Sequence, residues 1–337
     1  MKTEQMQTTM QNDTASGLTA RKAIGEEQAR KAMDTLQKYR QGKSALEARV
    51  IASEDWWRMR SWQRIQKGNP EDDKWTSAWL FNVIMGKHAD AIAAYPGPNI
   101  RPREPDDRME AQMLSSILPC ILEQNDFEEV YSDTCWQKMK QGTGVWGVYW
   151  DQEKLGGLGD ISIRPVNVLN LVWEPGVTDI QKSQNVFYLE LEDNETLLAA
   201  YPQLAGKLGG SSGLLARYRT DDAVDLSEKT LVVDWYYKKH EGGRMTLHFI
   251  KFCEGNLLYA TEQEEGMENG LYAHGRYPYE FDVLFPEKDS PAGFGYVDIM
   301  KDAQISIDNM WISFEKNVKW CLSLIHISEP TRHAQIS

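Results

Sequence analysis

The feature that most constrains this fold is a change of periodicity at Gly142. Before Gly142, apolar side chains recur at helical spacing. After it, short alternating or apolar runs separated by glycine-rich turns are typical of strands. Helical spacing returns only over Tyr296–Cys321. Helices, then strands, then a helix predict an α+β fold rather than a doubly wound α/β sheet.

Four helices are predicted before Gly142, over about 25–51, 76–95, 107–122 and 126–140. Gly42 is expected to interrupt the first, at a cost of about 1 kcal/mol relative to alanine. Asp106 or Asp107 should cap the third, and Pro119 should kink it. The apolar face of this third helix consists of Met113, Leu114, Ile117, Leu118, Ile121 and Leu122.

The middle of the chain is expected to form a mainly antiparallel β region with one short helix, Asn194–Ala200, and a flexible loop at Gly206–Gly213. The predicted strands are Val145–Trp150, Asp160–Arg164, Val166–Trp173, Asn185–Glu192, Leu231–Lys238, Arg244–Cys253, Asn256–Thr261 and Tyr279–Phe285.

Charge is distributed unevenly along the chain. The net charge is −13, but residues 21–67 carry twelve Lys and Arg against six Asp and Glu. The bulk of the protein is therefore strongly acidic and cannot coat DNA, because phosphate binding needs cationic neutralisation. The polar N-terminus has no apolar segment typical of a signal peptide, and no run reaches the roughly 18–20 apolar residues that span a bilayer. We therefore expect a product made in the cytoplasm, with no membrane partner.

Residues 21–67 form a basic, Trp-rich segment, with Trp56, Trp57 and Trp62 among three arginines. Three interpretations remain open. The segment is a nucleic-acid patch, a cationic arm that docks on acidic surface of the same or a neighbouring subunit, or an ordinary solvated helix.

Two glycine-rich motifs suggest nucleotide binding but lack its context. Gly142–Gly147 matches G-x-G-x-x-G, yet it follows a predicted helix and precedes a strand, the reverse of a dinucleotide site. It is better interpreted as a helix-to-strand turn that needs a positive φ or close packing. Gly206–Gly213 places its Gly-Lys pair at the wrong end for a P-loop.

No set of side chains predicts catalysis, a cofactor or a metal. The cysteines (Cys120, Cys135, Cys253, Cys321) are scattered, without a C-x-x-C pair or a histidine at ligand spacing. The histidines His88, His240, His248 and His274 are interpreted as surface or core-edge residues. The acidic pairs Asp106-Asp107 and Asp221-Asp222 are interpreted as solvated turns. We therefore assign no catalytic, cofactor-binding or metal-binding residue and expect a non-enzymatic protein.

The last residues have a different character. Leu322–Arg332 spells LSLIHISEPTR, which resembles one reading frame of a sequencing-library adapter. We interpret residues 322–337 as an artefact of sequence assembly and give His326 and His333 no functional weight. The genuine coding sequence would then be cut near Cys321, inside a predicted helix.

The order of segments resembles that of tailed-bacteriophage portal proteins, particularly podovirus-type and gut-phage sequences. The resemblance covers about residues 25–320. It rests on the helix-to-strand stretch QGTGVWGVYWDQE, on GDISIRPVNVLNLVWEP, and on SPAGFGYVDIMKDAQISIDNMW with Gln304 and Asn309.

The resemblance implies a wing region followed by the start of a stem helix. In these terms, residues 1–24 are a disordered tail, 25–141 a helical wing part with a basic arm, 142–285 a β-rich wing part, and 286–321 a loop and the beginning of the stem. It implies a ring of about a dozen copies at a capsid vertex of the virion, assembled in the host cytoplasm.

The partners that the resemblance implies are the terminase large subunit, head–tail connector or adaptor proteins, capsid and scaffold proteins, and double-stranded DNA passing through the ring. Two alternatives remain: another virion head or adaptor protein, or a nuclease or ATPase associated with packaging.

Overall fold

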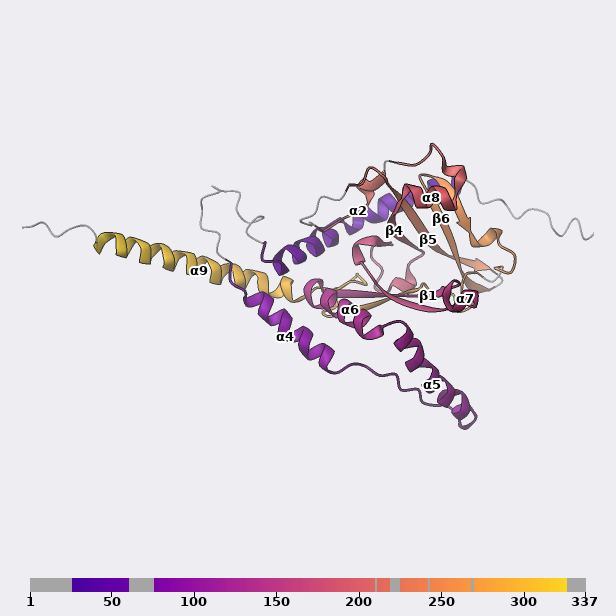
Figure 1. The fold of residues 1–337 in the computed structure, drawn as a ribbon, viewed down its shortest axis with the longest axis horizontal. Helices are drawn as coiled ribbons and strands as arrows, with labels where there is room; N and C mark the ends of the chain where they lie inside the picture. The colour runs from indigo at the N-terminus through magenta and orange to yellow at the C-terminus, as the bar shows by residue number, and fades with distance from the viewer. Residues whose placement is uncertain are drawn as a thin grey trace, which may run out of the picture.

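Two antiparallel sheets and the helices around them form the body of the protein, from which two helical projections extend (Figure 1). The structure is a computed structural model, and it describes residues 26–60, 76–209, 211–218, 225–241, 243–267 and 270–325. Within these residues the order of elements is helices, then strands, then a long helix, which confirms the predicted α+β class.

Within the described residues, six helices lie close to their predicted positions, whereas the single-turn helix α7 was not predicted. The helices are α2 (Glu26–Trp57), α4 (Trp79–Ala93), α5 (Arg108–Gln124), α6 (Phe127–Gln141), α7 (Lys154–Gly157), α8 (Asn194–Ala200) and α9 (Tyr296–Ile325). Among the described residues, none of the helices combines the length and hydropathy needed to cross a bilayer.

The strands form a small sheet of order β2-β1-β8 and a larger one of order β3-β4-β5-β6-β7, and each pairing is antiparallel. One predicted strand is wrong: Val166–Trp173 is split by the 3₁₀ turn Val168–Asn170, so that Val166 ends β2 and β3 begins only at Leu171. The strands are β1 (Thr143–Asp151), β2 (Asp160–Val166), β3 (Leu171–Trp173), β4 (Asn185–Asp193), β5 (Lys229–Glu241), β6 (Arg244–Cys253), β7 (Asn256–Ala260) and β8 (Tyr279–Val283).

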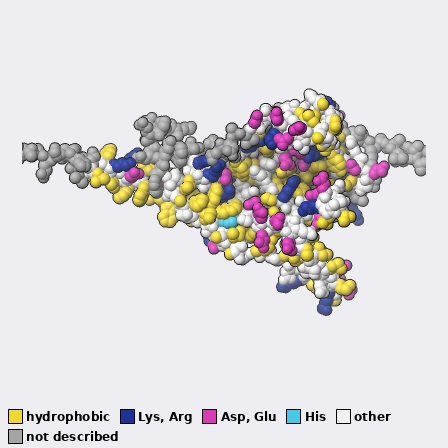
Figure 2. All heavy atoms as spheres, in the orientation of Figure 1, with side chains coloured by type: hydrophobic (Ala, Val, Ile, Leu, Met, Phe, Trp, Pro, Cys, Tyr) yellow, Lys and Arg dark blue, Asp and Glu magenta, His cyan; other side chains and the backbone are white. Residues whose placement is uncertain are grey.

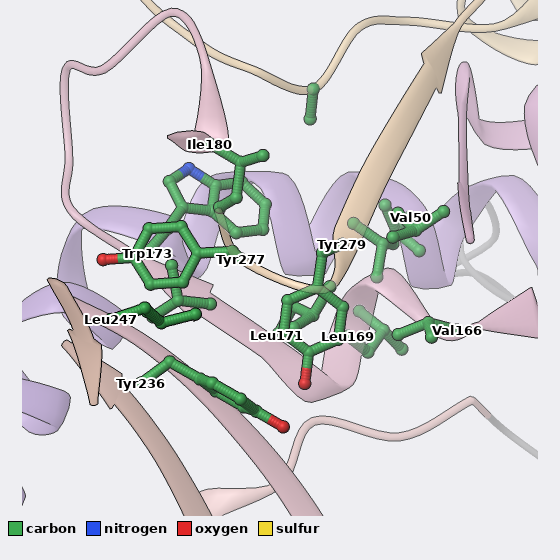
Figure 3. Packing of buried hydrophobic residues seen from close by; sticks show 14 residues of the cluster. Val50, Val166, Leu169, Leu171, Trp173, Ile180, Tyr236, Leu247, Tyr277 and Tyr279 are labelled. Carbon is green, nitrogen blue, oxygen red and sulfur yellow. The ribbon is translucent and has the colours of Figure 1, made fainter. Parts of the chain in front are cut away.

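The larger sheet is covered on both faces because side chains alternate along its strands. On β5, Val233 and Tyr237 face α2 and pack in the cluster that contains Leu36. Tyr236 lies between them in the alternation and faces the opposite side of the sheet. There it packs in a second apolar cluster against Tyr279 of the small sheet, with ring centroids 5.6 Å apart (Figure 3). The sandwich of α2, large sheet and small sheet is therefore the core.

The predicted interruption at Gly42 is wrong, since α2 runs unbroken through it. A Cβ atom added at Gly42 would lie 2.7 Å from Cγ of Pro175. The glycine is therefore explained by the close approach of α2 to the chain after β3. This close packing offsets its poor helix propensity.

Lys43 follows Gly42 and is buried at this contact. Its Nζ donates hydrogen bonds to the backbone carbonyls of Val168 and Leu171 and lies 3.8 Å from Glu47. Val168 lies in the 3₁₀ turn that separates β2 from β3, and Leu171 is the first residue of β3. Burial lowers the pKa of Lys43 to about 7. The lysine thus fastens α2 to the edge of the large sheet.

Two elements leave the body (Figure 1). The arm, residues 94–124, consists of the chain after α4, which includes the 3₁₀ turn Pro105–Asp107, and of α5, which runs on through Pro119. The cap predicted for α5 at Asp107 is wrong. Its carboxylate accepts a hydrogen bond from the backbone N–H of Glu104, in the preceding turn, and from no N–H of α5. The other projection is the second half of α9, which extends away from the sheets on the opposite side.

Candidate functional site

The glycine motif Gly142–Gly147 lies at the junction of α6 and β1, as the helix-to-strand interpretation predicts. Gly142 follows the last residue of α6, and β1 begins at the next residue. Gly142 ends α6 with a φ of 90° and donates its N–H to the carbonyl of Lys138. A Cβ here would lie 2.1 Å from the carbonyl carbon of Phe294, so only glycine fits. The hydroxyl of Thr143 accepts a hydrogen bond from the N–H of Gly293 at 2.9 Å. The motif therefore holds the loop that leads into α9.

Arg49 of α2 fixes the same loop from the other side. Its guanidinium donates to the carbonyl of Gly293 at 2.8 Å and lies 3.6 Å from the carboxylate of Asp298, in the first turn of α9. Asp298 in turn accepts a hydrogen bond from the N–H of Gly295 at 3.2 Å. An acidic side chain in this position is favourable at the N-terminus of a helix. The beginning of α9 is thus anchored to both α2 and the α6–β1 turn.

Farther along its length, α9 caps α4. The Ser77 N–H and hydroxyl both donate to Asp308, and the N–H of Leu80 donates to the side-chain oxygen of Gln304 at 3.1 Å. Gln304 returns a hydrogen bond to the carbonyl of Ser77. The N-terminus of α4 has no side-chain cap from its own residues, so α9 satisfies donors that would otherwise be unpaired. The direction of α9 is therefore coupled to that of α4.

Beyond this anchor, large apolar side chains of α9 are exposed. Near the base, Val297 is buried and packs with Leu80, Ile84 and Met139. Farther out, exposed large apolar side chains continue along the helix: Met310, Trp311, Phe314, Val318 and Trp320, exposed by 39–73%. Figure 2 shows hydrophobic side chains along this projection. A helix that buries its apolar face at one end and exposes it at the other is suited to a further packing partner.

The arm carries a second uncovered apolar surface on α5. Met109, Met113, Leu114 and Ile117, here called the α5 stripe, are exposed by 76, 59, 48 and 44%. On the other side of α5 lies a groove of about 910 Å³. It has an apolar floor and an acidic edge, and its lining is Tyr95, Gly97, Pro98, Pro119, Leu122, Glu123, Asp126, Phe127, Glu128 and Glu129.

The histidines lie apart from one another. His88 is buried on α4, stacked 3.6 Å from Trp136, with its ring nitrogen 3.2 Å from the carbonyl of Ser132. His248 is buried in β6 beside Thr261, whereas His274 stacks on Tyr272 in a loop and His240 is exposed near the end of β5. Within the described ranges, no group of three His, Cys, Asp or Glu side chains is placed to hold a metal ion.

The cysteines also lie apart. Cys135 and Cys253 are buried, and burial raises the pKa of the Cys253 thiol to about 11 and that of Cys135 above its usual value, so both are weak nucleophiles. Cys120 and Cys321 are exposed on α5 and α9. Asp106 and Asp107 form the turn before α5, and the second acidic pair, Asp221-Asp222, lies outside the described residues.

A comparison with known protein families tests the resemblance to portal proteins. The model of the phage P22-like portal protein family matches residues 89–279, more than half of the chain. The chain belongs to the P22-like portal protein family. No curated protein sequence matches it.

The portal match begins near the end of α4 and extends to the first residue of β8, so it includes the arm, α6, the larger sheet, and strands β1 and β2 of the small sheet. The residues that anchor α9 lie partly inside the matched range and partly beyond it. The glycine motif Gly142–Gly147 is inside the range, and Gln304 is beyond its end. Portal proteins are structural components of the virion and not enzymes. Membership implies a subunit that assembles with copies of itself into a ring.

Sequence reasoning missed two parts of this arrangement. It took the apolar residues of α5 as an ordinary helix face, although one signal was present: no charged residue occurs between Glu110 and Glu123. It also did not single out Arg49 or Thr143, whose partners lie more than a hundred residues away. Gln304 was noted as part of the portal-like segment, and the structure places it in the α9–α4 contact.

Proposed function

We propose that this chain is a structural subunit of a portal ring, with about a dozen copies around a channel at one capsid vertex. In this proposal DNA passes through the ring during packaging and ejection, and the ring connects head to tail. The observation that carries it is the family match combined with a helix, α9, that leaves the body and exposes large apolar side chains such as Met310, Phe314 and Trp320.

The division of the molecule follows from this proposal. Residues 25–141 and 142–285 are the helical and β-rich parts of the wing, residues 286–321 lead into the stem, and residues 1–24 form a tail outside the described range. The anchor at Gly293, Asp298 and Gln304 is then the junction of wing and stem, where the direction of the stem helix is set by α2, α4 and α6.

The acidic surface supports a channel through which DNA moves without adhering. With a net charge of −13, the protein as a whole has the same sign of charge as the phosphate backbone, which favours sliding over tight binding. The partners we propose are the terminase large subunit during packaging, then head–tail connector or adaptor proteins, and the capsid and scaffold. The source we propose is a podovirus-type or gut-phage genome, with assembly in the host cytoplasm.

We also propose that the natural sequence continues beyond residue 321 and that residues 322–337 derive from a sequencing adapter. The string LSLIHISEPTR supports this interpretation. The missing part would include the clip, the returning stem helix and the crown. Sequencing the gene directly from the source DNA tests the point: an uninterrupted frame through codon 321 with a different continuation is expected, and LSLIHISEPTR in the native gene would overturn it.

The proposed function is tested on protein made from that uninterrupted gene. Negative-stain electron microscopy should show annular particles with a central hole, and native mass spectrometry should give an integral number of subunits near twelve. Protein that remains monomeric, or that forms closed dimers without a central channel, would contradict the proposal.

A further inference from the structure

An exposed helix with no charge over three turns is the starting point. Between Glu110 and Glu123, α5 contains no Asp, Glu, Lys or Arg on any face, and the α5 stripe remains exposed. A solvated helix surface normally carries charged side chains, whereas the centres of protein interfaces are depleted of them. Among the residues of α5, only Ala111 is buried. This part of the arm is therefore built to be covered.

The two sides of α5 offer different surfaces. Met109, Met113 and Ile117 are spaced four residues apart and follow one line along the helix. At 3.6 residues per turn, the groove-lining residues Pro119 and Leu122 lie roughly a third to half a turn away from that line. Pro119 and Leu122 thus lie on the opposite side of the helix from the stripe, and Glu123, at the edge of the groove, lies about a quarter turn from Met113.

A rotationally symmetric ring needs this arrangement. In a ring, each subunit contacts its neighbour through two different surfaces that face in opposite directions, one matching the other. The α5 stripe is a convex apolar surface, and the groove is concave, with Phe127 and Leu122 in its apolar lining.

We propose that the α5 stripe of one subunit packs into the groove beneath α5 of the next copy of this chain. This inference rests on the proposed portal function and specifies one contact that closes the ring. The occupant is a second copy because the same helix presents both halves of the contact. The exposed apolar residues of α9 lie on the other projection and take no part in this contact.

The size of the contact agrees with a weak interface that repeats. The four stripe side chains expose on the order of 400 Å², within the range in which the largest apolar patch on a monomer is often functional. Stable complexes bury about 800 Å² on each partner. A single stripe-to-groove contact should therefore be weak, and only repetition round the ring makes it persistent.

The native cysteines provide a direct test. Cys120 is exposed on the same side of α5 as Met113, Cys135 and Cys253 are buried, and Cys321 is exposed on α9. In a Cys321→Ser background, Glu129→Cys places a second reactive thiol on the groove edge. A short bis-maleimide at high protein concentration should give a ladder of dimers, trimers and longer chains, because a head-to-tail contact propagates.

Two controls separate the possible outcomes. The Cys321→Ser chain, with Cys120 as its one exposed thiol among the described residues, should give no cross-linked product. A dimer here would mean that two stripes pack on each other, which overturns the head-to-tail contact. Replacing Glu129→Cys by Glu195→Cys, on exposed α8, should also give no ladder. A ladder of equal yield from the α8 variant, or none from the groove variant, would overturn the inference as well.

A charge test distinguishes the contact from loss of folding. Met113→Glu/Ile117→Glu should reduce the ladder by about tenfold or more, because new carboxylates would face the acidic groove edge. Met113→Lys/Ile117→Lys alters the same exposed positions equally but should retain or raise the yield. Adding Glu123→Lys/Glu128→Lys to the Glu variant should restore it. Equal losses in the Glu and Lys variants would contradict the contact.

This inference and the proposed function can fail separately. If the uninterrupted protein forms rings but the Cys120/Glu129→Cys pair gives no ladder, the α5 contact is wrong and the portal function stands. If the uninterrupted protein forms no ring, the proposed function is wrong, whatever the cross-linking shows.

Discussion

The sandwich of sheets and the two projecting helices use the same kinds of apolar residue with opposite results. In the sandwich, Phe187 and Leu36 are fully buried between β4 and α2. On α5 and α9, Met109 and Phe314 are exposed by 76 and 60%. Apolar burial stabilises a fold only where a second layer covers the face. The projecting faces therefore contribute little to the stability of one subunit and are free to stabilise an assembly.

The largest expected effect comes from shortening an apolar side chain in the sandwich, compared with the same kind of change on a projecting helix. Phe187→Ala removes a ring packed against Tyr39 and Trp235, and should lower the free energy of unfolding by about 4 kcal/mol. Met109→Ala, on the α5 stripe, should change it by less than about 0.5 kcal/mol. Chemical denaturation of dilute protein measures both. A comparable loss at Met109 would mean that the stripe is already covered within one subunit.

The second-largest effect on stability is expected at Lys43, the buried lysine between α2 and the large sheet. Lys43→Met should cost about 3 kcal/mol, because the buried carbonyls of Val168 and Leu171 each lose the hydrogen bond from Lys43 Nζ. Lys38→Met, on the exposed side of the same helix, is the control and should be nearly neutral. If the two changes had equal effects on denaturant unfolding, α2 would not be fastened at this point.

A buried carboxylate gives the core a pH dependence. Asp234 lies on β5 with its Oδ1 enclosed and without a hydrogen-bond partner among the described residues. Burial raises its pKa from 3.8 to about 6, against the opposing effect of Lys251. The folded state thus holds the proton more tightly than the unfolded state. The stabilisation this gives is complete below about pH 4 and is lost as the pH rises towards 6.

Asp234→Asn should therefore stabilise the protein by about 1–2 kcal/mol at pH 8 and have little effect at pH 4. Thermal unfolding across this range measures it. Asp302→Asn, on the exposed surface of α9, provides the comparison and should not alter the profile. If Asp234→Asn gave the same gain at both pH values, burial of the charge would not be the cause of that gain.

The smallest expected effect on stability comes from glycine-to-alanine substitutions, which should have opposite signs in α4 and α2. Gly86→Ala in α4 meets no atom within 4 Å and should stabilise the protein by about 1 kcal/mol, as helix propensity predicts. Gly42→Ala in α2 must displace Pro175 and should destabilise it by about 1 kcal/mol despite the same gain in propensity. Stabilisation by both substitutions, measured by thermal unfolding, would show that α2 is not closely packed there.

Much of the fold was predictable because its signals are local. The boundaries of β6 and α8 match their predicted residues, since alternation or helical spacing ends there at turn-forming residues. The helix-to-strand role of Gly142 followed from the order of its neighbours. The interruption expected at Gly42 was wrong because propensity describes an isolated helix, and here packing against Pro175 outweighed it. The division into domains, the basic-arm interpretation and the adapter-derived tail stay predictions.

The sequence by itself determined the class of the fold, the positions of most helices and strands, and the resemblance to portal proteins, because periodicity and turn chemistry act over a few residues. Only the tertiary structure decided which apolar faces are covered. It also showed that Gln304 and Asp308 cap a helix more than two hundred residues earlier in the chain. Burial and long-range hydrogen bonds depend on which segments meet in space, and no local pattern on α5 or α9 specifies that meeting.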